Sequence, residues 1–152
     1  MKTFTQENGR LEIMERLKDL HPDLPRRWGK MTAHQMVCHL SDSFLMVMGE
    51  IGFTPADNLF SRTLMKWMAL HMPTPWPKGI KTRPEADQLL LGTKPAEFAA
   101  DIDRLTRLID RYADQSRDFE FKSHPIFGSM TEYEWMRWGY LHCDHHFRQF
   151  GI

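Results

Sequence analysis

The sequence predicts an all-α protein: a four-helix bundle in which a long connection, carrying a short extra helix, joins the second and third helices. Four stretches place apolar residues at intervals of three and four, the period of a helix with one buried face. No stretch alternates apolar and polar residues as a half-buried strand does, so we expect no sheet. With 152 residues and no domain linker, the chain is predicted to form one domain over residues 1–152.

Composition and charge narrow the functional classes. The 20 basic and 20 acidic side chains give no net charge, which argues against binding to nucleic acid or to an anionic membrane. No apolar run reaches the roughly 20 residues of a membrane-spanning helix. The first residues lack the apolar core of a secretory signal, and the two cysteines, Cys38 and Cys143, are too few for a disulfide framework. We therefore expect a cytoplasmic protein with free thiols.

The first helix is predicted over residues 5–20. Leu11, Met14, Leu17 and Leu20 recur at intervals of three and would form its buried stripe. Pro22 then ends the helix, because proline disfavours helical geometry in the residue before it.

The second helix is predicted to begin after Thr32, a residue type that caps helix N-termini, and to end at Gly49 or Gly52. His39 lies at the margin of its apolar stripe and can face inward, whereas His34 lies further round and is expected to face solvent. The stripe consists of Met36, Val37, Leu40, Phe44, Val47 and Met48.

The connection between the second and third helices spans residues 53–95, where helical periodicity breaks up. A short helix is predicted over residues 57–71. Residues 72–79 contain too many prolines for a regular element and are typical of a lid or binding loop. The predicted apolar side of the short helix consists of Leu59, Leu64, Trp67, Met68 and His71.

The third helix is predicted over residues 96–114, with Pro95 near its first turn. A turn-rich loop at residues 124–129 precedes the last helix. Thr131 and Glu134 have the spacing of a capping box, which predicts that this helix begins there.

A histidine cluster is the strongest candidate site. His142 and His146 are one helical turn apart, so their rings can converge on one point from a face that is otherwise aromatic. With His39 from the second helix, they would form a three-histidine site for zinc, nickel, copper or iron that leaves coordination positions open. The alternative is that these are ordinary hydrogen-bonded histidines.

Other residues near this cluster have weaker assignments. Gln149 could brace the ligands or simply end the helix, and His145 is rotated onto the helix flank. His124, in the loop before the last helix, could approach the site or be a loop histidine. Trp76 and Trp135 are predicted to line a pocket together with His124.

Two segments resemble the DinB/YfiT-like superfamily of metal-binding four-helix bundles. They are residues 28–40, WGKMTAHQMVCHL, and residues 142–149, HCDHHFRQ. The resemblance places the metal ligands of that superfamily on His39, His142 and His146, and it extends over nearly the whole chain. The His-Pro-Ile-Phe-Gly loop at residues 124–128 resembles a subgroup whose function is not established.

The resemblance implies a divalent metal ion, most often nickel or zinc, and a homodimer. It also implies either a transferase that delivers a low-molecular-weight thiol, such as glutathione, bacillithiol or mycothiol, to a small-molecule electrophile, or a thiol-dependent isomerase. The alternative is a non-catalytic, metal-stabilised bundle that binds a small molecule or a protein partner in a stress response.

Overall fold

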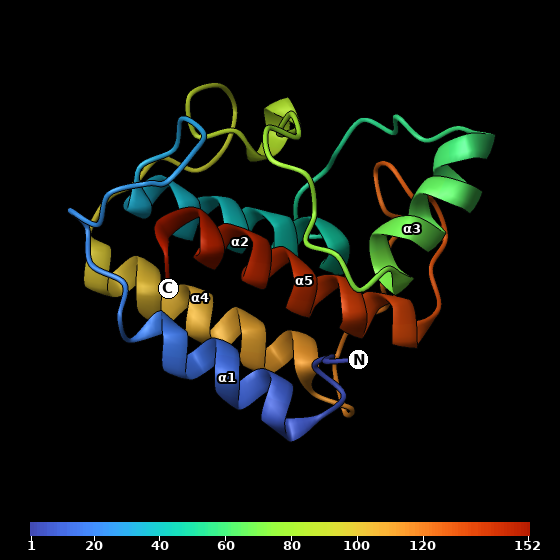
Figure 1. Ribbon diagram of the computed structural model, residues 1–152, viewed down its shortest axis with the longest axis horizontal. Coiled ribbons are helices and arrows are strands. Elements are labelled where there is room, and N and C mark those ends of the chain that lie inside the picture. Colours follow the sequence, from blue (N-terminus) through green and yellow to red (C-terminus); the bar gives the residue numbers. More distant parts are fainter.

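The computed structural model describes residues 1–152 and is all-helical, with five α-helices and no strands (Figure 1). A π-helical turn (Ser61–Met65) and a 3-10 turn (Pro84–Ala86) interrupt the long connection. No helix combines the length and the apolar character needed to cross a lipid bilayer. The helices are α1 (Glu7–Leu17), α2 (Ala33–Met48), α3 (Lys66–His71), α4 (Phe98–Ala113) and α5 (Glu132–Phe150).

Four long helices, α1, α2, α4 and α5, lie side by side, and the connection between α2 and α4 loops over one side of them (Figure 1). α2 packs against α4 and α5, and α1 packs against α5. Apolar side chains from all four helices form one core. This arrangement is compatible with the predicted four-helix bundle.

The ends of α2 and α5 are formed by the residues that the sequence indicated. The side chains of Thr32 and Thr131 each accept a hydrogen bond from a backbone N–H three residues on. The side-chain oxygens of Gln35 and Glu134 in turn accept from the backbone N–H of the capping threonine. Gly49 ends α2 with a φ of 86°, a left-handed conformation that favours glycine. Both helices that carry the histidine cluster therefore begin at a capping box.

The buried face of α1 agrees with the predicted one in part: Leu17 is buried and Met14 packs against the core, but Leu11 is not buried. Leu11 is 52% exposed, and the helix buries Gly9, Ile13 and Leu17. Gly9 lies so close to the amino-terminal segment that a Cβ there would be 2.3 Å from the Thr3 carbonyl oxygen. This close contact turns the Gly9 face toward the protein, and Leu11 consequently faces solvent.

The predicted apolar side of the short helix also faces outward. Leu59 is 79% exposed and Trp67 is 57% exposed. The helix instead buries Leu70, which was not on the predicted side, in the core. Polar contacts to α5 add to this: Lys66 pairs with Glu134, and the Arg137 guanidinium donates to the Leu70 carbonyl oxygen. The apolar pattern therefore identified a helix here but not its buried side.

Asp42, which is fully buried on α2, anchors the later part of the connection. Its carboxylate accepts hydrogen bonds from the Gln88 amide at 3.0 Å and from the Thr93 backbone N–H and hydroxyl at 2.8 and 2.7 Å. These bonds hold the segment around Ala86 against α2, one turn from His39.

Gly139 allows the rings of Tyr112 and Phe4 to pack directly against the backbone of α5. A Cβ at this position would lie 2.7 Å from Tyr112 Cε1 and 2.9 Å from the Phe4 ring, and both rings are buried. Gly139→Ala should therefore destabilise the protein by about 1–3 kcal/mol, despite the higher helix propensity of alanine, because overpacking must displace the two rings.

Urea unfolding measures this effect. Gly52→Ala is the control, because a Cβ at Gly52 meets no atom within 4 Å. A Gly139→Ala variant as stable as the wild type would show that the rings yield freely.

Candidate metal centre

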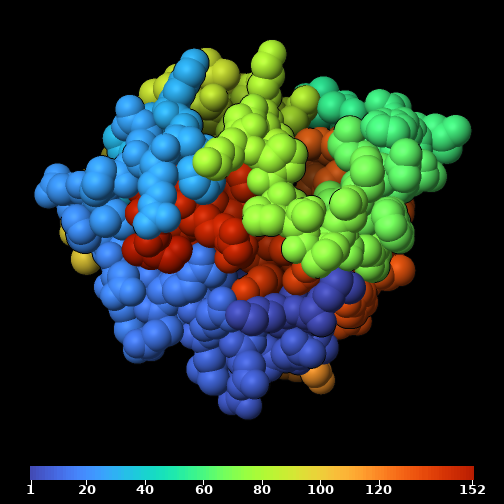
Figure 2. Space-filling view, in the orientation of Figure 1, coloured from blue at the N-terminus to red at the C-terminus, as the bar shows by residue number.

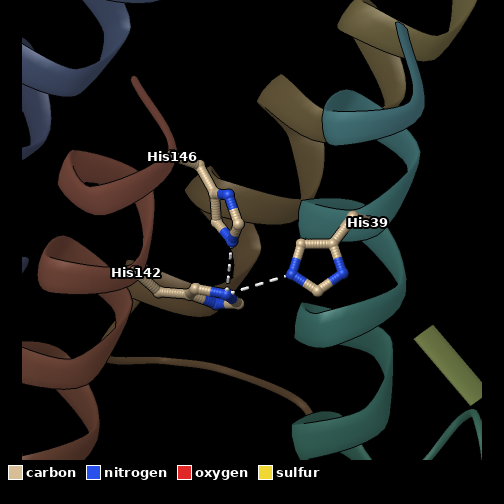
Figure 3. Close-up of side chains that lie close together, drawn as sticks. All are labelled: His39, His142 and His146. Carbon is tan, nitrogen blue, oxygen red and sulfur yellow. Dashed lines mark hydrogen bonds between the residues drawn. The ribbon is translucent and has the colours of Figure 1, made fainter. Parts of the chain in front are cut away.

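Three imidazoles converge between α2 and α5. His142 and His146 project from successive turns of α5, and His39 projects from α2 toward them (Figure 3). The Nε2 atom of His142 lies 3.2 Å from Nε2 of His39 and 3.2 Å from Nε2 of His146. All three side chains are at least nine-tenths buried. The structure thus brings together the three predicted ligands.

The outer nitrogens of two rings are held by the protein. His39 Nδ1 lies 2.8 Å from the Ala86 carbonyl oxygen, and His146 Nδ1 lies 2.9 Å from Gln149 Oε1. Because these oxygens only accept, each Nδ1 carries the hydrogen, and each Nε2 is left with a lone pair directed at the cluster. This is the tautomer that binds a metal ion through Nε2.

The donor set fits a divalent cation. Two of the three facing Nε2 atoms have no hydrogen, so the one hydrogen that His142 could supply cannot satisfy both at once. His142 Nδ1 is also buried without a hydrogen-bond partner. A cation between the three lone pairs would satisfy them together, and imidazole nitrogen is a ligand for zinc and nickel.

Burial favours the ligating form of these rings. Desolvation lowers the pKa of His39, His142 and His146, and the neighbouring imidazoles lower the pKa of His142 and His146 further. The three histidines are therefore neutral near pH 7, which is the state that metal coordination requires.

Gln149 connects the cluster to the start of α2. Its Oε1 accepts from His146, and its Nε2 donates to the Trp28 carbonyl oxygen at 2.9 Å. The side chain passes close to Gly29, where a Cβ would be 2.4 Å from the Gln149 amide nitrogen. Gln149 therefore braces a candidate ligand, which is one of the two roles that its sequence position suggested.

A cavity of about 580 Å³ adjoins the triad, and its lining includes all three histidines. Its walls are mainly apolar, including Met46, Met68, Trp76, Phe127 and Trp138. The space-filling view shows α5 (red) in a hollow between the light-blue segment before α2 and the green connection (Figure 2). The candidate metal centre is thus part of the wall of a pocket of small-molecule size.

A family model described as "Protein of unknown function (DUF1569)" matches residues 4–151. The chain belongs to this family. Comparisons with curated proteins and with solved structures found no match. The site of this DUF1569 protein must therefore be interpreted from its own geometry.

Two of the three predicted pocket residues line the cavity of the DUF1569 protein. Trp76 lies over the site with its ring centroid 6.0 Å from that of His142, and its Nε1 donates to the Ala69 carbonyl oxygen. His124 is buried and also lines the cavity. Trp135 does not: it is 1% exposed in the core, where it stacks on Phe121 behind His124.

Residues without a distinctive sequence pattern complete the site. The Ala86 carbonyl could not have been identified from sequence, because any residue type supplies that atom. Trp138 faces the cavity in place of Trp135, since it lies one turn before His142 on α5. His145 lies at the cavity edge between Trp28 and Trp76.

A second cluster lies on the α4 side of α2. His34 was expected to face solvent, but its Nε2 lies 2.7 Å from the Asp101 carboxylate, which also accepts from the Ala96 backbone N–H and the Cys38 thiol. Burial, followed by the charge of Asp101, raises the pKa of Cys38 to about 12. The neutral thiol acts here as a donor joining α2 to α4. Neither Cys38 nor Cys143 lines the cavity.

Replacing Gln149 should weaken metal binding without removing a ligand. Gln149→Met keeps the length of the side chain but loses the acceptor for His146, so we expect metal affinity to fall about 10- to 100-fold with the same stoichiometry at saturation. Competition titration against a chelator measures the affinity. The exposed Gln115→Met is the matched control, and equal affinity in the two variants would contradict the bracing role.

His124 should make the metal-free protein less stable in acid. Burial lowers its pKa to about 3, below the value near 6.5 of an unfolded chain, so the unfolded state binds more protons as the pH falls from 6.5 toward 3. Between pH 7.5 and 5 this costs about 2 kcal/mol of unfolding free energy.

Urea unfolding in chelator at the two pH values measures this loss, which should be about 2 kcal/mol smaller in His124→Asn than in the wild type. Equal losses would show that His124 is not buried in the neutral form.

Proposed function

We propose that this DUF1569 protein is a metal-dependent transferase that delivers a low-molecular-weight thiol to small electrophiles. The observation that carries the proposal is the position of three convergent imidazole Nε2 atoms in the wall of a largely apolar cavity. Three protein ligands that leave coordination positions open are typical of reactive rather than purely structural metal sites.

His39, His142 and His146 would hold the ion, with nickel or zinc the best candidates for three imidazoles. A bound divalent cation would lower the pKa of a thiol that it coordinates, so that the thiol reacts as the nucleophilic thiolate. The protein supplies the neutral tautomers of His39 and His146, which Ala86 and Gln149 maintain.

The cavity residues suit the two reactants. The methionine and aromatic side chains can accommodate an apolar electrophile and exclude water from it. Lys81 is an exposed lining residue and forms no ion pair within the protein, so it can meet a carboxylate of an acidic thiol. Trp76 covers the triad from the proline-rich loop.

The proposed reaction is a substitution. A sulfur–carbon bond forms between the thiol and the electrophile as the bond from that carbon to its leaving group breaks. The leaving group departs with the bonding electron pair, and the proton of the thiol is released. No oxidant or reductant is needed.

The resemblance to the DinB/YfiT-like superfamily supports the same proposal, and it extends it to a homodimer. Two buried cysteines without a disulfide suit the proposed cytoplasmic location.

Metal loading and thiol transfer should depend on the same residue. Protein reconstituted with nickel or zinc should hold about one ion per chain and consume glutathione, bacillithiol or mycothiol in the presence of an electrophile panel. His142→Ala should lose both the ion and the turnover, and a chelator should abolish turnover in the wild type. Elemental analysis and thiol titration measure the two properties. The exposed His21→Ala, away from the cavity, is the matched control.

Different outcomes would contradict different parts of the proposal. Unchanged metal content in His142→Ala would refute the metal centre. A loaded protein that gains thermal stability but turns over no thiol would refute the transferase and favour the non-catalytic, metal-stabilised bundle.

A further inference from the structure

The loop that carries His124 holds this residue with four hydrogen bonds. The His124 backbone N–H donates to the Gly128 carbonyl oxygen at 2.8 Å, and the Gly128 N–H donates to the His124 carbonyl oxygen at 2.9 Å. This pair of bonds closes the loop. Within it, His124 Nδ1 accepts from the backbone N–H groups of Ile126 and Phe127, each at 3.1 Å. A further bond from the Ala56 N–H to the Pro125 carbonyl oxygen ties the loop to the long connection.

These bonds determine which nitrogen of His124 carries the hydrogen. Because two N–H donors point at Nδ1, that nitrogen must present its lone pair, and the hydrogen of the neutral ring is on Nε2. The ring orientation is also restrained, since His124 stacks on Phe127 at 4.6 Å between centroids and meets the Trp138 ring at 5.4 Å.

The Nε2–H group of His124 is available to a ligand. It forms no hydrogen bond within the protein. Its nitrogen atom is not fully enclosed and keeps some accessible surface. His124 is 7% exposed and lines the same cavity as the histidine triad. Because His124 borders the cavity and its Nε2 is not fully enclosed, this N–H group can meet a ligand bound there.

The donor is also uncharged. Burial holds the pKa of His124 at about 3, so the ring is neutral at any physiological pH. Its surroundings are apolar or aromatic, with Phe127 and Trp138 against it and Met46 among the other lining residues. The side chains that contact the His124 ring are aromatic and uncharged, so a carboxylate at this donor would lose its hydration without meeting a cation there, and a neutral oxygen acceptor suits it better.

We propose that His124 Nε2–H is the hydrogen-bond donor for the cavity ligand, and that this ligand is an uncharged molecule with an apolar body and a carbonyl or comparable oxygen acceptor. That the ligand is the electrophile of the transfer reaction rests on the proposed function. In that role the donor would polarise the carbonyl and direct selection toward carbonyl-bearing electrophiles. The hydrogen-bonding subsite itself does not depend on turnover.

Two probes of similar shape test the subsite by binding alone. Acetophenone has an apolar ring and a carbonyl acceptor, and 2-phenylpropene replaces the carbonyl oxygen with a methylene group. His124→Asn keeps an oxygen for the Ile126 and Phe127 N–H groups, but its amide is too short to place a donor at the Nε2 position. Acetophenone affinity should fall about 10-fold in His124→Asn, whereas 2-phenylpropene affinity should stay within about twofold.

Calorimetric titration of the full chain measures the affinity of each probe. The titrations are made with and without chelator, because a bound ion could itself attract the carbonyl. The infrared carbonyl stretch of acetophenone bound to the chelated wild type gives a second readout, independent of whether the variant folds. A lower frequency than in hexane is expected from a donated hydrogen bond.

The inference is overturned if acetophenone does not bind, if both probes lose affinity equally in His124→Asn, or if the bound carbonyl stretch matches that in hexane. Failure of the transferase proposal would look different: acetophenone would bind through His124, but no thiol would be consumed.

Discussion

Burying three imidazoles with their Nε2 atoms facing one another is the constraint on which the rest of the structure depends. Lone pairs at this separation gain nothing from each other, and removing them from water is costly without a partner. The arrangement persists because the outer nitrogens of His39 and His146 are bonded to groups that only accept. The protein thereby maintains a geometry suited to a cation.

The long connection between α2 and α4 contributes two groups to the site, the Ala86 carbonyl and the Trp76 side chain. The Ala86 carbonyl orients His39, and its position follows from the buried carboxylate of Asp42, which holds Gln88 and Thr93. Earlier in the same connection, Trp76 covers the triad. A segment with little regular structure is thus held in place near the site by specific hydrogen bonds.

The aromatic wall links packing in the core to the cavity. Tyr112 donates to the Trp135 carbonyl oxygen, and its ring lies against α5 at Gly139, so this side chain links α4 to α5. Trp135 in turn packs against His124, which lines the cavity. A rigid core on one side and a closed loop on the other leave His124 little freedom to reorient.

The sequence by itself determined the features that are local. Helical periodicity identified the long helices, the Thr32 and Thr131 caps followed from short-range hydrogen bonding, and the spacing of His142 and His146 placed them on one face. The predicted convergence of His39 with that pair agrees with the structure, because each of these residues lies toward the inward face of a strongly patterned helix.

Only the tertiary structure decided which apolar side chains are buried, which residues line the cavity and which polar groups form hydrogen bonds with one another. Leu11 and Trp67 belong to the predicted apolar sides of their helices yet face solvent. Trp138 rather than Trp135 lines the cavity. His34 found a carboxylate on α4, and Ala86 supplies an atom common to every residue. Periodicity defines a face to within about one residue, or 100° of helix rotation, whereas a hydrogen bond or a cavity wall depends on contacts between segments far apart in the chain.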